Sequence, residues 1–225
     1  MTDRYDNNSV VRVLNRCTDL VVLNLLFLFC SIPIVTLGAS LSAMYAVSLR
    51  SVRFGDGYVL QNFFPAFKKN FRQATAAWLG FLAVWFLLYV DAKFWKYSDM
   101  GVMADALQMF SIAVAMMFFM VAVWMFPLIA KMQGTLREQF VNACKMSIGY
   151  FFPYTVVVVG LPLVAGYLAY INGPMLMLMG IIGCSTIAFI SSHFFYKAFA
   201  NHISEESLGC DDLLFGQNED ASNND

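Results

Sequence analysis

The sequence predicts an all-α membrane protein, a polytopic bundle of transmembrane helices. The first observation is that residues 146–196, a stretch of 51, contain no Asp, Glu, Lys or Arg. Helices of soluble proteins keep a charged face toward solvent, whereas this stretch suits two membrane spans of about 20 residues each with a turn at 172–174. The second observation is composition: hydrophobic residues make up 60% of the chain and charged residues 13%.

Four segments have the length and charge-free composition of transmembrane helices. They cover residues 73–90, 106–130, 148–170 and 175–196, and each is flanked by polar residues. Residues 1–203 are therefore expected to form a single membrane domain. Residues 204–225 carry seven acidic side chains and no basic one, which predicts a disordered cytoplasmic tail.

The apolar run over residues 20–49 predicts a helical hairpin broken near 33–40. Pro33 lies in its middle and disfavours a helical Ile32, while Thr36 can cap a new helix after the break. One long tilted helix is the alternative. We expect two arms, at about 10–31 and 37–53, forming a hairpin that penetrates the membrane.

The placement of Lys and Arg favours the hairpin over a single crossing. If the run crossed once, the basic residues that precede it would lie outside, against the positive-inside rule. If it enters and returns, twelve of the fourteen Lys and Arg are cytoplasmic and only Lys93 and Lys96 are external. Both termini are then expected in the cytoplasm.

Backbone at the tip of the hairpin must be shielded, because unpaired amides are costly in lipid. The second arm suits shielding by a close neighbour, since small residues recur every four positions at Gly38, Ser42 and Ala46. Such residues let helix backbones approach each other. Chance spacing in a helix rich in Ala and Ser is the alternative.

Residues 58–72 predict an amphipathic helix lying in the cytoplasmic interface. Aromatic rings recur with basic side chains beside them, which suits rings buried among lipid headgroups and charges near phosphates. The interface residues are Phe63, Phe67, Lys68, Lys69, Phe71 and Arg72. Pro65 fits best near the first turn of this helix. Residues 138–145 show the same amphipathic pattern more weakly.

Polar residues of the hairpin are the main candidates for a functional site. Arg16 and Asp19 are spaced for an ion pair at the interface, and Asn24 lies deeper. Broken helices with polar groups at depth also form the binding sites of transporters. A structural role and the binding of a solute or partner both remain open for the candidate set Asp19, Asn24, Pro33, Thr36, Gly38 and Ser40.

The sequence shows no catalytic motif, and we expect no enzyme, no cofactor and no metal site. Five scattered cysteines lack the spacing of metal ligands. The four spans hold no acidic or basic residue, which disfavours an ion-coupled pump. A net charge of −1 gives no reason to expect nucleic acid as a partner.

Residues 14–78 resemble the YesL-like family, a bacterial group of integral membrane proteins with a domain of unknown function. The resemblance rests on Asn15, Asp19, Asn24, Cys30, the string Pro-Ile-Val-Thr-Leu-Gly-Ala-Ser over 33–40, and Asn-Phe-Phe-Pro-Ala-Phe-Lys-Lys-Asn-Phe over 62–71. It implies a multi-pass protein of the bacterial cytoplasmic (inner) membrane, associated with sugar-uptake and polysaccharide-degradation systems and without an assigned reaction.

Two functions follow as expectations. The first is an accessory or regulatory component linked to carbohydrate uptake or utilisation. The alternative is a small passive or secondary transporter with a solute site at the broken helix over 33–40. The expected partners are the lipid bilayer and a sugar permease or other membrane protein, or a second copy of the chain.

Overall fold

In the computed structural model, every regular element of the described residues is a helix, which confirms the all-α class. The structure describes residues 9–54, 59–98, 101–132, 134–149 and 156–200, so the predicted tail over 204–225 lies outside them. The elements are α1 (Ser9–Cys30), the 3-10 helix η1 (Ile34–Thr36), α2 (Leu37–Phe54), α3 (Val59–Lys96), α4 (Val102–Lys131), α5 (Leu136–Gly149), α6 (Val156–Ile171), α7 (Gly173–Leu178), a π-helix (Met179–Gly183) and α8 (Cys184–Ala200).

Three of the described helical segments are long and apolar enough to cross a membrane. They are α3, α4 and Met179–Lys197, which correspond to three of the four predicted spans. The span predicted at 148–170 lies partly outside the described residues: α5 is described as far as Gly149, residues 150–155 are not described, and α6 contains the apolar stretch Val158–Leu168.

The N-terminal apolar run is divided into two helices, as the sequence predicts. α1 ends at Cys30 and α2 begins at Leu37. Between them Pro33 has an extended backbone, with φ −75° and ψ 116°, and its carbonyl accepts the N–H of Thr36 at 2.9 Å. α2 then packs against α3, α4 and α8, so the second arm of the hairpin is the central helix of the bundle.

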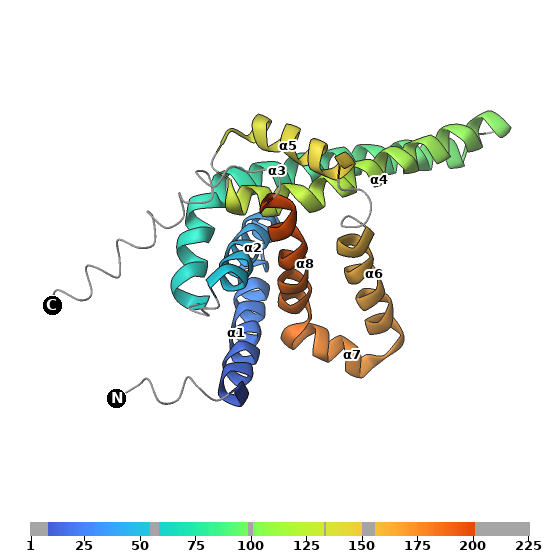
Figure 1. Cartoon of the computed structure of the whole chain (residues 1–225). Coiled ribbons are helices and arrows are strands. Elements are labelled where there is room, and N and C mark those ends of the chain that lie inside the picture. The colour runs from blue at the N-terminus through green and yellow to red at the C-terminus, as the bar shows by residue number, and fades with distance from the viewer. Residues whose placement is uncertain (1–8, 55–58, 99–100, 133, 150–155, 201–225) are drawn as a thin grey trace, which may run out of the picture.

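The interfacial helix predicted over 58–72 and the span predicted over 73–90 form one continuous helix, α3. The sequence around Gln73 contains no glycine or proline that would end a helix. Pro65 lies inside α3 rather than in its first turn, and a proline there removes a helical hydrogen bond and favours a bend. Figure 1 shows the beginning of α3 running at an angle to its long remainder.

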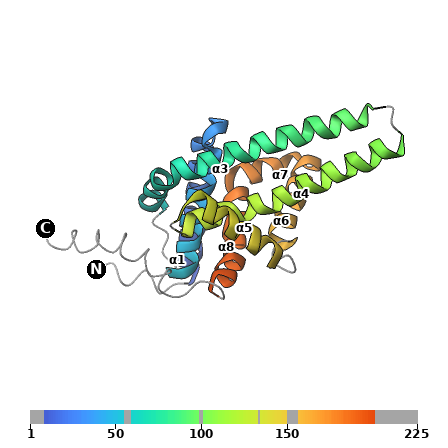
Figure 2. The same ribbon diagram turned by 90° about the horizontal axis from the view of Figure 1, so that it is seen from above.

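α3 and α4 form a long antiparallel arm that projects beyond the other helices (Figure 2). α4 follows Gly101, whose φ of 60° is a conformation that glycine adopts without a steric cost. Toward its tip the arm exposes large apolar side chains, among them Phe86, Leu87, Phe110 and Met117. From here on "the arm" means this projecting part of α3 and α4, described over residues 82–98 and 101–117, and not a helix of the hairpin.

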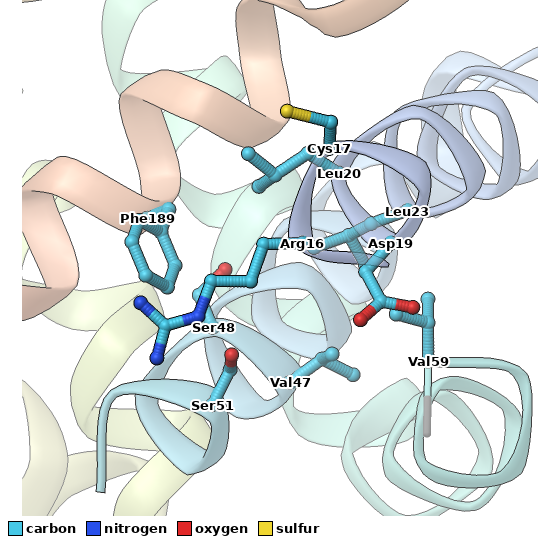
Figure 3. Close-up of a pocket in the computed structure, with 10 residues that line it drawn as sticks. All are labelled: Arg16, Cys17, Asp19, Leu20, Leu23, Val47, Ser48, Ser51, Val59 and Phe189. Carbon is cyan, nitrogen blue, oxygen red and sulfur yellow. The ribbon is translucent and has the colours of Figure 1, made fainter. Parts of the chain in front are cut away.

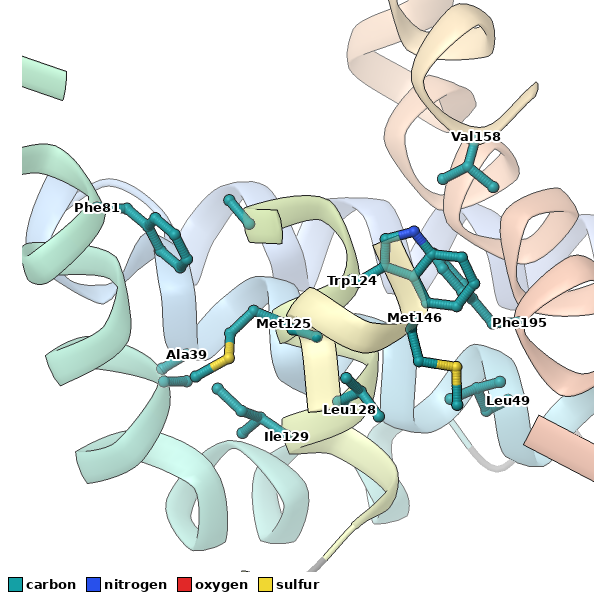
Figure 4. Close-up of a cluster of buried hydrophobic side chains, with 13 residues drawn as sticks. Ala39, Leu49, Phe81, Trp124, Met125, Leu128, Ile129, Met146, Val158 and Phe195 are labelled. Carbon is teal, nitrogen blue, oxygen red and sulfur yellow. The ribbon is translucent and has the colours of Figure 1, made fainter. Parts of the chain in front are cut away.

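Two clusters of buried side chains hold the helices together. The larger joins α2, α3, α4, α5, α6 and α8 (Figure 4), and in it the fully buried Trp124 meets Phe195 edge-on, with ring centroids 4.9 Å apart. The second joins α1, α2, α3 and α8 and contains Leu23, Met44 and Phe63. α2 contributes to both clusters, which explains its central place.

α5 contains the second interfacial segment predicted over 138–145 and packs along α4. It begins with a capping box: the Thr135 N–H donates to Glu138 Oε2 at 3.1 Å, and the Glu138 N–H donates to Thr135 Oγ1 at 3.4 Å. This exchange satisfies backbone donors that a helix start otherwise leaves unpaired.

Candidate functional site

The candidate residues predicted from the sequence lie in separate places along α1 and α2. Asp19 lines a cavity beside the middle of α1, whereas Asn24 contacts the π-helix. Thr36 and its neighbours surround the turn after α1. At the rise of an α-helix, Asp19 lies about 16 Å along α1 from its end at Cys30. The predicted set therefore does not form one pocket.

At the turn between α1 and α2, the backbone carbonyls are bonded by side chains of the chain itself. Thr36 Oγ1 lies 2.7 Å from the Cys30 carbonyl oxygen and 2.8 Å from that of Pro33. Trp78 of α3 donates its Nε1–H to the Ile34 carbonyl at 2.9 Å. These contacts supply the shielding that backbone in lipid requires.

The role predicted for Thr36 is therefore corrected. The sequence predicted that Thr36 would cap the beginning of α2, whereas its described hydroxyl contacts close the end of α1. The 3-10 turn brings the hydroxyl back over Cys30, which residue spacing alone does not show. Ser40 is fully buried and donates to the Thr36 carbonyl at 3.1 Å, so both hydroxyls are engaged within the chain.

Asn24 is fully buried and bonds the π-helix and the beginning of α8. Its Nδ2 donates to the Gly180 carbonyl at 2.6 Å, and its Oδ1 accepts the N–H of Ser185 at 3.1 Å. Ser185 Oγ in turn lies 2.7 Å from the Leu20 carbonyl oxygen. A π-helix changes the usual backbone pairing, and the Asn24 amide bonds one backbone group inside it, the Gly180 carbonyl, and one just after it, the Ser185 N–H.

The π-helix was not predicted from the sequence, in which residues 175–196 have the composition of a single span. The pattern gives little warning of a π-helix, because its extra residue leaves hydropathy unchanged. Gly180 and Gly183 are the one local hint, since glycine tolerates irregular backbone.

Small residues of α2 lie against α3. A Cβ added at Gly38 would be 2.5 Å from Trp78 Cβ and 2.6 Å from the Ala74 carbonyl oxygen, so the two helices approach too closely for any other residue. One turn later the buried Ser42 accepts a hydrogen bond from Asn70 Nδ2 at 3.2 Å. Ala46, the third member of the predicted row, is half-buried beside the second cluster.

The predicted interface residues divide between the protein interior and the surface. Phe63 is fully buried and stacks on Phe67, with ring centroids 6.2 Å apart. The prediction that the whole row of rings lies among lipid headgroups is therefore corrected, because α1 and α2 pack against this part of α3. Phe71 and the basic side chains Lys68, Lys69 and Arg72 are exposed, as contact with lipid phosphates requires.

A cavity of about 160 Å³ opens between α1, α2, α8 and the beginning of α3 (Figure 3). Its polar lining residues are Arg16, Asp19, Ser48 and Ser51. Figure 3 shows the Arg16 guanidinium beside the two serines and the Asp19 carboxylate turned toward Val59. The ion pair predicted between Arg16 and Asp19 is not formed, although both residues are described.

A second cavity, of about 320 Å³, lies among α1, α2, α3, α4, α6 and α8. Its wall is apolar and rich in rings, including Tyr45, Trp78, Trp85, Phe119 and Phe126. The indole of Trp78 is already bonded to the hairpin turn. This cavity suits an apolar body but offers few groups that would orient a polar solute.

Other titratable groups of the described residues do not converge on a site. No three His, Cys, Asp or Glu side chains within the described ranges gather as metal ligands do. Asp91 at the outer part of α3 accepts hydrogen bonds from Trp95 Nε1 at 3.1 Å and from Ser111 Oγ, so it ties α3 to α4. Asp91 is therefore engaged in the packing between the two helices.

Comparison with known proteins gives one match. Residues 20–92 match the model of a family described as "Protein of unknown function, DUF624", which includes the YesL-like proteins. The match covers the second half of α1, all of α2 and most of α3, about a third of the 225 residues. No curated protein and no solved structure matches the chain. The chain is therefore similar, over its N-terminal part, to an uncharacterised family.

Proposed function

We propose that the chain is an accessory or regulatory component of a membrane system for carbohydrate uptake or utilisation. The membrane part of the proposal is supported by the three long apolar helical segments. The carbohydrate part is supported by the resemblance of residues 14–78 to the YesL-like family, together with the match over 20–92 to a family without an assigned reaction. We further propose that it lies in the bacterial cytoplasmic membrane with both termini inside.

The observation that carries the proposal is the arm formed by α3 and α4. Phe86 and Phe110 are each 67% exposed and Met117 is 63% exposed. Apolar surface that projects from one chain suits lipid or the transmembrane helices of another protein. An accessory component needs such a surface, whereas an enzyme needs converging polar groups.

The test is recovery of a partner with the tagged chain in mild detergent, from cells grown on a carbohydrate that they import. We expect a sugar permease to be recovered in a constant ratio. The double variant Phe86→Ala, Phe110→Ala should lower that ratio severalfold. The control Phe29→Ala removes a similarly exposed ring outside the arm (73% exposed) and should leave the ratio unchanged.

Recovery of the chain alone as a homo-oligomer, with the arm variants behaving like the control, would contradict the proposal. The identities of neighbouring genes provide a second, independent observation on the partner. If none of the neighbouring genes encodes a protein of carbohydrate uptake or degradation, the proposed link to carbohydrate loses its support.

A small passive or secondary transporter remains the second candidate, and the interrupted helices favour it. The turn after α1 and the π-helix before α8 both break a helix, and α1 contacts both. Discontinuous helices form the solute sites of many transporters. Liposomes should then take up a labelled sugar, and Thr36→Val or Ser40→Ala should slow the uptake. Absence of uptake with any sugar that supports growth would retire this candidate.

A further inference from the structure

We propose that the cavity between α1, α2 and α8 binds an anionic amphiphile: an apolar chain that carries a singly charged oxyanion, either the phosphate of a phospholipid or the carboxylate of a free fatty acid. The proposal is independent of the function proposed above. It rests on the lining of the cavity and on one buried hydroxyl group in it.

The hydroxyl belongs to Ser48, a residue of α2 that is 1% exposed. Its Oγ has no hydrogen-bond partner among the described residues. A buried helical serine ordinarily donates to the carbonyl four residues earlier, as Ser40 does on the same helix and Ser192 does on α8. Ser48 does not make this bond, and it lines the cavity. Its hydroxyl group is therefore available to donate a hydrogen bond to a ligand there.

Arg16 brings a positive charge to the same end of the cavity. Figure 3 shows its guanidinium beside Ser48 and Ser51, and no hydrogen bond or ion pair joins it to another described residue. A guanidinium binds the two oxygens of a phosphate or carboxylate side by side. The Ser48 hydroxyl can add a further donor to such an oxyanion.

The rest of the lining selects the body of the ligand. Leu20, Leu23, Val47 and Phe189 make most of the wall apolar. At about 160 Å³ the cavity is several times larger than the roughly 30 Å³ that one water occupies in the liquid. Asp19 on the opposite side disfavours a second negative charge, so a free inorganic phosphate fits less well than a singly charged headgroup.

The test is native mass spectrometry of the full chain, purified in a neutral detergent and titrated with four probes: phosphatidylglycerol, oleate, diacylglycerol and inorganic phosphate. We expect phosphatidylglycerol or oleate to be retained at least tenfold better than diacylglycerol or phosphate. Retention of the phospholipid alone assigns a membrane lipid as the source, and retention of oleate alone assigns a fatty acid.

Variants connect the binding to the cavity. Arg16→Gln should weaken retention about tenfold, the effect expected for a lost charge-assisted hydrogen bond. The matched control Arg137→Gln removes an exposed arginine outside this cavity and should bind like the unmodified chain. Equal losses in both variants, or no preference for the anionic amphiphiles over diacylglycerol, would overturn the proposal.

Ser48→Ala separates binding from folding. Removing an unpartnered buried hydroxyl should leave the melting temperature of the ligand-free protein unchanged or higher, while retention of the anionic probe falls severalfold. A lower melting temperature with unchanged retention would show that Ser48 serves the fold and not a ligand.

Discussion

Asn24 on α1 donates its side-chain N–H to the carbonyl oxygen of Gly180 at 2.6 Å, across 156 positions of the chain. Asn24 lies inside the segment 20–92 that matches a known family, and Gly180 lies outside it. The bond therefore ties the segment that the family model matches to the C-terminal helices outside that match. The π-helix depends for its pairing on a residue of the hairpin.

Replacing Asn24 by Leu should destabilise the protein. The substitution keeps the volume but leaves the Gly180 carbonyl and the Ser185 N–H without their side-chain partner. In a titration with denaturing detergent, we expect the free energy of unfolding to fall by about 1–3 kcal/mol. Hydrogen bonds between membrane helices contribute less than those in soluble proteins, which favours the lower end of this range. Asn172→Leu is the control, because Asn172 is exposed and should change it by less than about 0.5 kcal/mol. Equal effects would contradict the role of Asn24.

Gly38→Ala should destabilise the contact between α2 and α3, since the added Cβ would meet Trp78 and the Ala74 carbonyl at about 2.5 Å. Overpacking of this kind costs about 1–3 kcal/mol. Gly80→Ala is the matched control, because its Cβ would meet nothing within 4 Å. In a helix it should be neutral or stabilise by about 0.5–1 kcal/mol. The idea fails if the melting temperatures of the two variants coincide.

Thr36→Val should weaken the hairpin turn. The variant keeps the shape of the side chain and removes the hydroxyl that bonds the Cys30 carbonyl. A loss of about 1 kcal/mol is expected in the free energy of unfolding. Thr18→Val removes an exposed hydroxyl that bonds only within its own helix and should be close to neutral. Unchanged stability in both variants would show that the turn does not need the hydroxyl.

The predicted orientation of the chain can be measured with single cysteines in a background without the five native ones. Ser98→Cys marks the end of the arm, and Thr135→Cys marks the beginning of α5. A membrane-impermeant maleimide added to intact cells should label the first and leave the second unlabelled until the cells are opened. The opposite pattern would reverse the orientation inferred from the basic residues.

Features with a local cause were predictable from the sequence. The break after α1 follows from Pro33 and from the distribution of charge, and the all-α class follows from hydropathy and length. The continuity of α3 was not predicted, because a change from amphipathic to apolar composition near Gln73 looks like a boundary although the backbone has no reason to stop there.

The candidate site was only partly predictable, since its contacts join residues far apart in the chain. The sequence picked out Asn24 as a polar residue at depth but not the π-helix that it binds. It paired Arg16 with Asp19 by spacing, whereas the Arg16 side chain points to the side of the cavity where Ser48 and Ser51 lie (Figure 3). Packing between helices, which no local pattern encodes, decides each of these side-chain orientations.

The turn after α1 has a consequence for how the hairpin sits in a bilayer. Ile32 and Ile34 are 72% and 68% exposed, while Thr36 and Trp78 already bond the nearby carbonyls of Cys30 and Ile34. Because these carbonyls are bonded within the chain, they do not need water as a partner, which lowers the cost of placing the loop in hydrocarbon. How far the hairpin descends is then governed by its opposite end, where the charges of Arg16 and Asp19 have to stay within reach of water.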